Sequence, residues 1–354
     1  MTGPLPASGP SGSTEPGEPT DRSPGGPAWP RLTRTAAGGH HLLLLDDDVT
    51  WSDLDALVGS SVVGATWRPA PTDGPPGLPG VLDLLAAEHA EILAAGHAVP
   101  TLPDGTLERA TLTGPWRVDI VNRADLGLPA WASTAFVVDV GAERSGAVPR
   151  LPDGYGDLLD AFGDHHPTGL ERQVLDVLAA CARRLAGGLR TSEGVVVEPD
   201  PASAVDITLY SPTWLEPAAT AAILEPHLPG LVLLRGVEEA AAAGLDGYGA
   251  DWPVPTATPS SVTLHVEAAE VIPAALADCA WTGGGVIAYR LQWLADPAVR
   301  AAAAGRLPGE TAAALETREH ARAAISEAAR ALHAAAGGEL VDEDELLLDP
   351  TDLA

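Results

Sequence analysis

The chain contains no lysine. All 20 of its basic residues are arginine, and they stand against 49 acidic residues, which gives a formal net charge of −29. Nucleic acids and anionic membrane surfaces attract proteins through clustered cations. We therefore expect a partner that is neither a nucleic acid nor a membrane. GC-rich coding or adaptation to salt would explain the missing lysine without reference to function.

Cysteine is nearly absent as well. Cys181 and Cys279 are the only two, too few for a disulfide framework, so a reducing compartment fits best. No apolar run approaches the roughly 18 residues that a membrane-spanning helix needs. The first residues also lack the basic segment and apolar core of a signal peptide. These features predict a soluble, cytoplasmic protein.

Proline, glycine, serine and threonine dominate residues 1–30. Such a segment buries too little apolar surface to offset the entropy lost on ordering, so residues 1–38 are expected to form a disordered tail. An α/β region is predicted over residues 39–145. Its expected strands cover 41–47, 61–69, 116–122 and 135–140, and its expected helices cover 50–59 and 80–97.

A C-terminal α+β domain is predicted over residues 157–354. Its clearest helix covers 168–188, where Thr168 and Glu171 have the spacing of a capping box. Cys181 lies on the apolar face of this helix, which makes it a core residue and not a nucleophile. The elements expected after it are a strand over 205–211, a helix over 215–228, strands over 230–237 and 261–268, a helix over 270–280 and a strand over 284–294. This βαββαβ order predicts a ferredoxin-like core over about 205–294.

A faint internal repeat surrounds that core. Residues 182–201 and residues 329–350 both run from the end of a helix through a double glycine and a strand to Asp-Pro. The pattern predicts two helix-plus-hairpin units, one on each side of the core. Duplication would produce it, and so would chance, because a helix, a glycine cap and a strand often follow one another.

The stretch "HHLLLLDDD" at 40–48 places three aspartates after an apolar strand. With the helix that follows, it resembles the start of response-regulator receiver domains, and "VDIVNRADLGLP" resembles their later strand, with Asp125 as phosphoacceptor. The receiver site needs a lysine, which this chain lacks, and the interval from Asp46 to Asp125 is about twice the usual one. The receiver hypothesis is therefore rejected. Because neighbouring strand residues point to opposite faces, at most Asp46 and Asp48 could share Mg²⁺; helix capping and solvation are the simpler roles.

A second acidic and histidine-rich stretch gives a candidate metal site. Asp164, His165 and His166 precede the helix predicted from 168, and carboxylates and imidazoles are common ligands of zinc and similar ions. The additional ligands would come from His227, His265 or Glu267. No HExxH or CxxC spacing is present, so an ordinary surface loop explains the same residues.

Aromatic residues give a candidate binding surface. Tyr248 and Trp252 lie in a predicted long loop over 240–260, and long loops often bind ligands or partners. Trp214, Trp252 and Trp293 would line an aromatic groove for a ligand. The alternative is that they fill the space between sheet and helix, as large aromatics do at strand-to-helix junctions.

No catalytic constellation and no cofactor motif is recognisable, so we expect a non-catalytic interaction or regulatory protein whose partner is another protein. Two alternatives stay open. One is a metal-dependent hydrolase using Asp164, His165 and His166. The other is an acidic mimic or sequestering protein that binds a basic partner through residues 337–353.

Overall fold

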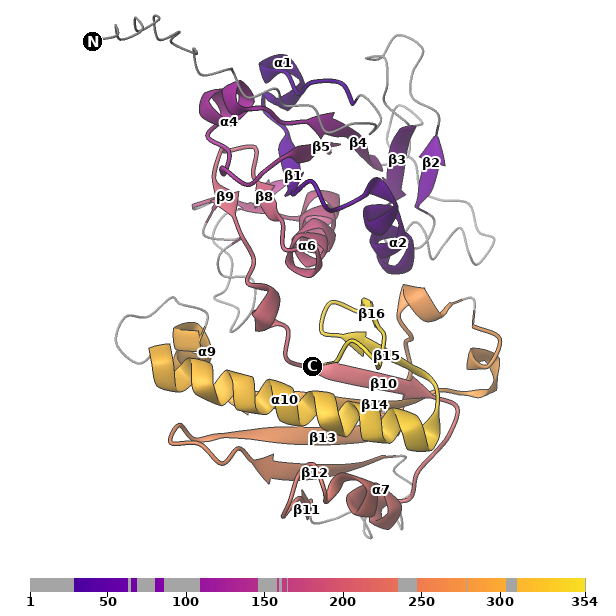
Figure 1. Cartoon of the computed structure of the whole chain (residues 1–354). Helices are drawn as coiled ribbons and strands as arrows, with labels where there is room; N and C mark the ends of the chain where they lie inside the picture. The colour runs from indigo at the N-terminus through magenta and orange to yellow at the C-terminus, as the bar shows by residue number, and fades with distance from the viewer. Residues whose placement is uncertain are drawn as a thin grey trace, which may run out of the picture.

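The computed structural model describes residues 29–62, 65–68, 80–85, 109–145, 158, 161–163, 165–234, 247–277, 279–303 and 311–353. These residues form two domains, each built on one seven-stranded sheet (Figure 1). Every ladder within the two sheets is antiparallel. The predicted mixture of α and β structure is confirmed.

The N-terminal domain has the sheet order β2-β3-β4-β5-β1-β8-β9. Its strands are β1 (His41–Leu45), β2 (Thr66–Arg68), β3 (Gly80–Leu85), β4 (Arg109–Arg117), β5 (Thr134–Asp139), β8 (Gly188–Arg190) and β9 (Val196–Val197). Helices α2 (Trp51–Ser61) and α6 (Gly169–Arg184) cover one face, and α1 (Arg34–Ala37) and α4 (Ile120–Leu126) cover the other. A small separate ladder joins β6 (Arg144–Ser145) to β7 (His166–Pro167).

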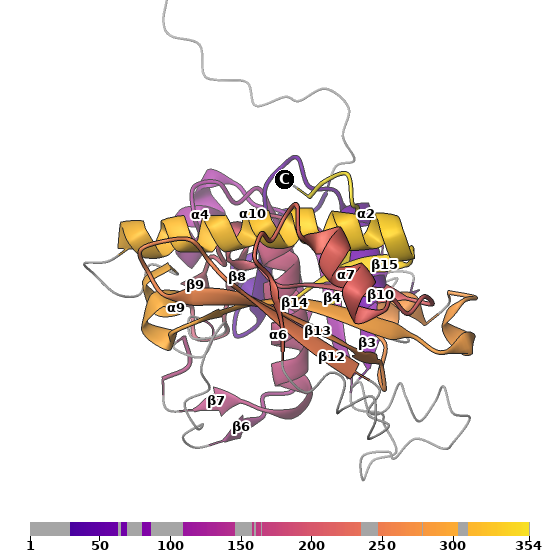
Figure 2. The ribbon, with the colours of Figure 1, turned by 90° about the horizontal axis from the view of Figure 1, so that it is seen from below.

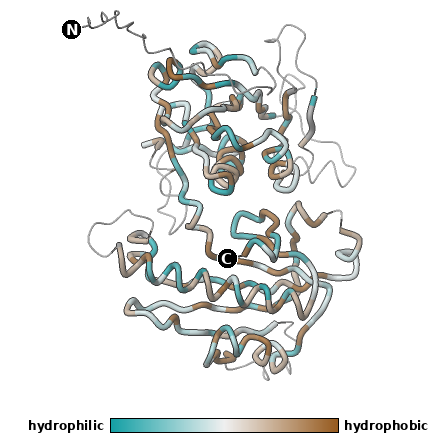
Figure 3. The backbone as a smooth tube through the Cα atoms, in the orientation of Figure 1, coloured by the Kyte–Doolittle hydropathy of each residue, from teal (hydrophilic) through white to brown (hydrophobic). Residues whose placement is uncertain are grey.

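The C-terminal domain has the sheet order β11-β12-β13-β14-β10-β15-β16. Its strands are β10 (Ile207–Ser211), β11 (Val232–Leu233), β12 (Gly247–Pro253), β13 (Ser260–Ala268), β14 (Ile287–Ala295), β15 (Glu339–Asp342) and β16 (Leu347–Leu348). Helices α7 (Pro217–Leu224), α9 (Pro297–Ala303) and α10 (Thr311–Ala336) cover one face. The short 3₁₀ turns η2 (Ala274–Leu276) and η3 (Thr282–Gly284) lie on the other side, and η1 (Pro201–Ser203) links the domains. Figure 2 shows α10 running along its sheet, and Figure 3 shows polar and apolar residues alternating along this helix.

The two domains are structural repeats of each other. Each consists of a strand, a helix, a four-stranded meander, a long helix and a hairpin, and the two sheets place these strands in the same order. The register agrees as well: Leu43 pairs with Phe136 and Leu189, and Leu209 pairs with Tyr289 and Leu340. Phe136 and Tyr289 are both fully buried, so each core is centred on an equivalent aromatic ring.

The segments 182–201 and 329–350 occupy equivalent places in these repeats. Each contains the end of the long helix and the final hairpin. Gly187 and Gly338 are equivalent, because a Cβ on either would collide with the carbonyl oxygen of the facing strand residue, Leu44 or Tyr210. Aligning the two double glycines in sequence would pair Gly187 with Gly337, so the structural correspondence is shifted from it by one residue. The backbone, and not the letter pattern, sets the correspondence.

Several predicted boundaries are wrong in the N-terminal domain. The helix expected over 80–97 begins instead as strand β3, and residues 86–97 lie outside the described part of the chain. The strand expected over 116–122 ends at Arg117, and α4 follows it. Asp119 causes the change, because its side chain accepts hydrogen bonds from the N–H groups of Val121 and Asn122 and so starts a helix.

The boundaries of the domains also differ from those predicted. Helix α6 and strands β8 and β9 complete the first sheet, so the N-terminal domain continues past residue 145 to β9. The tail expected over 1–38 falls outside the described residues as far as 28, but Leu32 is fully buried and α1 packs with it. The folded part therefore begins earlier than expected.

Residues 205–294 do not form the predicted ferredoxin-like core; their strands belong to the antiparallel seven-stranded sheet of the C-terminal domain. The described residues of 270–280 contain the 3₁₀ turn η2, preceded by Pro273, and no α-helix. The predicted loop 240–260 contains strand β12, which adds a strand to the expected order. Its glycines and aspartate weaken the strand pattern in the sequence.

Candidate functional site

A buried polar cluster lies beside the N-terminal end of α6. Glu171, from the first turn of α6, is 1% exposed and its Oε1 is 3.0 Å from Nε2 of His41, the first residue of β1. The guanidinium of Arg144 ion-pairs with the same oxygen at 2.9 Å, and the N–H of Glu143 donates to Oε2 at 2.9 Å. The carboxylate thus joins three segments that are distant in the sequence.

The ring of His41 has no nitrogen left for catalysis. Its Nδ1 accepts a hydrogen bond from the backbone N–H of Ser192 at 3.0 Å, which leaves the ring proton on Nε2 to donate to Glu171. A general base needs a free nitrogen within reach of a substrate proton. The geometry therefore gives His41 and Glu171 a structural role.

This cluster replaces the capping box expected at Thr168 and Glu171. The side chain of Thr168 makes no capping hydrogen bond, although Thr168 is the N-cap of α6. The carboxylate of Glu171 instead points to His41 and Arg144. In contrast, Thr50 and Asp53 form a complete capping box at the start of α2.

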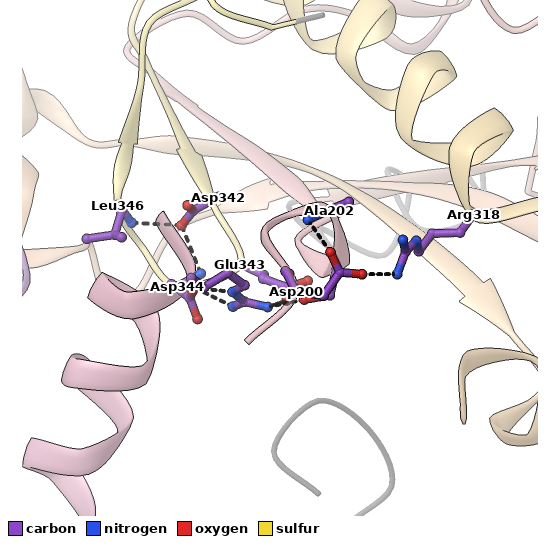
Figure 4. A network of polar contacts seen from close by, with 9 residues as sticks. Asp200, Ala202, Arg318, Asp342, Glu343, Asp344 and Leu346 are labelled. Carbon is purple, nitrogen blue, oxygen red and sulfur yellow. Dashed lines mark hydrogen bonds and ion pairs between the residues drawn. The ribbon is translucent and has the colours of Figure 1, made fainter. Parts of the chain in front are cut away.

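A second polar cluster joins the two domains. Arg183, near the end of α6, donates from Nε to the carboxylate of Asp344 at 2.9 Å, pairs with Glu343, and reaches Ser203 of the linker at 3.2 Å. Figure 4 shows the carboxylates of this cluster on the turn between β15 and β16. Burial disfavours the charge on Arg183, but Asp344 and Glu343 outweigh this effect and raise the pKa of the guanidinium. We call these four residues the domain clamp.

Carboxylates next to the clamp have raised pKa values. Burial raises the pKa of Asp342 to about 6, although its Oδ1 accepts the N–H groups of Leu346 and Asp344, each at 2.9 Å (Figure 4). Burial likewise raises the pKa of Asp206 to about 6, although the N–H of Trp293 donates a hydrogen bond to its Oδ1 and thereby lowers the pKa. Asp342 and the side chain of Asp344 are buried, whereas Glu339, Glu343, Glu345, Asp349 and Asp352 of the same segment are exposed.

The linker is fixed from the C-terminal side as well. Asp200 accepts the N–H of Ala202 at 2.9 Å and pairs with Arg318 of α10 at 2.7 Å (Figure 4). Arg318 is buried and also donates to the carbonyl of Ala303 at 3.0 Å. The linker is therefore held by an ion pair from the C-terminal domain and by a hydrogen bond from Arg183 of the N-terminal domain.

The predicted metal ligands are not seen as a set. Asp164 lies outside the described residues, His165 is exposed, and His166 forms part of β7, where its Nδ1 is buried without a hydrogen-bond partner. Of the proposed additional ligands, His227 lies 3.5 Å from Glu327 and Glu267 pairs with Arg290, while His265 is exposed on β13. Within the described part of the chain, no group of three or more histidine, cysteine or acidic residues could hold a metal.

The predicted aromatic groove consists mostly of core residues. Tyr248, Trp252 and Trp293 are buried in the core of the C-terminal domain. The Tyr248 hydroxyl donates to the carbonyl of Leu215, and the Trp252 indole donates to that of Pro229, whereas the buried Nε1 of Trp293 has no hydrogen-bond partner among the described residues. Trp214 is partly exposed and meets Tyr248 edge-to-face at 5.4 Å. The structure brings these two rings together as packing and leaves one edge of Trp214 accessible.

The aspartates after β1 and the thiol of α6 have structural roles. Asp46 accepts the N–H of Asp47 and the hydroxyl of Ser133, and Asp48 is exposed. Cys181 is fully buried, and this burial raises the pKa of its thiol to about 12. A thiol with this pKa is not a nucleophile at neutral pH, as its place on the apolar face predicted.

The exposed apolar surface on α4 was missed by sequence reasoning. Ile120 is 78% exposed and Val121 is 51% exposed, and both lie on the first turn of the helix. Arg117 and Arg31 lie beside them, Arg31 paired with Asp119 at 2.6 Å. We call this surface, with the neighbouring Arg34, the α4 face. The apolar letters in "VDIVN" suggested a strand, and the signal for a helix was Asp119 at the N-cap.

Comparison of the chain with models of protein families, with curated proteins and with solved structures finds no match. In the part of the chain that the structure describes, no helix is both long enough and apolar enough to cross a membrane.

Proposed function

We propose that this protein is a non-catalytic binding protein that recognises another protein through its α4 face. The observation that carries the proposal is the exposure of Ile120 and Val121 at adjacent positions, at 78% and 51%. Adjacent exposed apolar residues with a polar rim are typical of interaction surfaces. Arg31, Arg34 and Arg117 form that rim.

The use of the buried polar groups supports the same proposal. His41, Glu171 and Arg144 hold the N-terminal domain together, and Arg183 holds the two domains together. A catalytic acid or base needs an unsatisfied group that reaches a substrate. The hydrolase and the acidic mimic remain alternatives, but neither is favoured by a specific contact.

Affinity capture from the lysate of the source cells tests the proposal. The wild-type protein is expected to retain one or more proteins that the double variant Ile120→Asp, Val121→Asp does not, because two buried carboxylates would oppose binding. Val232→Asp is the matched control: Val232 is 61% exposed on β11, in the other domain. Identical capture by the wild type and the double variant would remove the α4 face as the binding surface.

A further inference from the structure

We propose that the α4 face binds the α7 side of a second copy of this chain, so that copies associate head to tail. The inference rests on the function proposed above and names its partner. It extends a contact that already exists inside the chain, where α2 of the N-terminal domain lies against η2 of the C-terminal domain.

The first step is that α4 and η2 are equivalent. Each lies between the fourth and fifth strands of its repeat. Leu126 of α4 packs over Leu44 of β1, in the same cluster as the Ala135 that pairs with Leu44. By the shared register, Tyr210 matches Leu44 and Ala288 matches Ala135. Leu276 of η2 packs in one cluster with Tyr210 and Ala288, as Leu126 does with Leu44 and Ala135. The η2 surface of the C-terminal domain, which α2 contacts, therefore corresponds to the α4 face of the N-terminal domain, where Ile120 is exposed.

The second step is that α7 is the counterpart of α2. Both helices follow the first strand of their repeat, and both are preceded or begun by a Thr-Trp pair. On α7, Ala218 and Ala219 are exposed, and Trp214 just before it is 36% exposed. Small side chains allow close approach of a partner helix, and an accessible indole adds apolar area.

The charges of the two surfaces are complementary. Residues 29–38 and 115–127, which carry the α4 face, contain four arginines and two aspartates, in a chain of net charge −29. Residues 211–230, which contain α7, have two glutamates, Glu216 and Glu225, and no arginine. An acidic helix side thus meets a locally basic face.

The contact between copies lacks the domain clamp. The residue equivalent to Arg183 on α10 is Ala334, and the turn of the β8–β9 hairpin has only Glu193 where the other turn has Glu343 and Asp344. The association between copies is therefore weaker than the contact within a chain and depends on concentration. A head-to-tail contact joins two different surfaces, so it gives open chains or closed rings.

Sedimentation velocity over a range of concentrations tests the proposal with two blocked variants of the full chain. Ile120→Asp with Val121→Asp blocks the α4 face, and Ala218→Arg with Ala219→Arg blocks the α7 side. The wild type is expected to form species larger than a dimer, with an association constant at least about tenfold above that of either variant alone. An equimolar mixture of the two variants is expected to form a dimer that grows no further. Circular dichroism and thermal unfolding of each variant check that it is folded.

Other outcomes overturn the proposal. If the α7-blocked variant associates alone, the α4 face binds another surface, such as its own copy. If the wild type is monomeric at several hundred times the concentration in lysate, no second copy binds. If lysate capture still depends on Ile120 and Val121, the proposed function stands with a different partner. If capture does not depend on these two residues, both the proposed function and this inference are wrong.

Discussion

Ala186 and Gly337 occupy the same position in the two domains and share a left-handed backbone. Each is followed by a glycine, Gly187 or Gly338, that lies close to a backbone carbonyl of β1 or β10. The φ angle is 49° at Ala186 and 66° at Gly337. A residue with a Cβ pays about 1 kcal/mol or more in this conformation, whereas glycine does not. The N-terminal domain thus has strain at a point where its repeat has none.

Exchanging these two residue types is expected to have opposite effects. Ala186→Gly should raise the free energy of unfolding by about 0.5–1 kcal/mol, because relief of strain exceeds the added entropy of the unfolded chain. Gly337→Ala should lower it by about 1 kcal/mol. Urea unfolding of both variants is the measurement. A decrease for both would contradict the strain at Ala186.

The domain clamp is expected to stabilise the protein far more than a surface ion pair. Arg183→Leu should lower the free energy of unfolding by about 3 kcal/mol, because it leaves Asp344 buried without its partner. The matched control is Arg322→Leu, which breaks an exposed pair with Glu319 and should cost less than about 1 kcal/mol. Denaturant unfolding compares them, and equal losses would show that the clamp is not a buried pair in solution.

Thr168 and Glu171 have the spacing of a capping box, but Glu171 binds Arg144 and His41 instead, and two substitutions distinguish these roles. Glu171→Ala should cost about 3 kcal/mol, because it leaves the Arg144 guanidinium without its buried carboxylate. Thr168→Ala should cost less than about 0.5 kcal/mol, because the hydroxyl makes no capping bond. Thermal unfolding at one pH distinguishes the two. A loss of about 1 kcal/mol for Thr168→Ala would instead indicate a working cap.

Asp342 is expected to make stability fall as the pH rises through about 6. Its folded-state pKa of about 6 lies above the ordinary aspartate value of 3.8, because burial disfavours the charged form, so the folded protein holds this proton more tightly than the unfolded chain. The contribution is complete below pH 4 and is lost as the pH rises through 6. By linkage it amounts to about 2–3 kcal/mol.

The measurement is the difference in unfolding free energy between the wild type and Asp342→Asn from pH 4.5 to 8. Asparagine keeps an oxygen for the N–H groups of Asp344 and Leu346 without the charge. The variant should gain stability relative to the wild type as the pH rises. A constant difference across this range would mean that Asp342 titrates normally.

Sequence reasoning identified elements best where one face is buried and the ends are marked. The helix over 168–188 and the strand over 135–140 correspond to α6 and β5. Strand β3 was mistaken for a helix because "VLDLLAAEHAEILAAGH" has helical periodicity, while pairing with β4 decides the conformation of its first residues. Local patterns contain no information about that partner.

The same limit applies to the candidate site. The four aromatic residues were identified as prominent, but only the sheet shows that three of them face the core. The partners of Glu171 lie on β1 and β6, and His41 is 130 residues away. A capping box with a sequence separation of three is visible in the sequence, whereas a contact over 130 residues is not.

The position of β1 determines when the N-terminal domain can close during synthesis. β1 is made before both of its partners, since it pairs with β5 on one side and with β8 on the other. Until residues 188–190 leave the ribosome, one edge of β1 has no partner and its leucines have no complete cover. The second domain repeats this order, since β10 waits for β15. Translation therefore exposes an open strand edge twice, and each time the last hairpin ends that exposure.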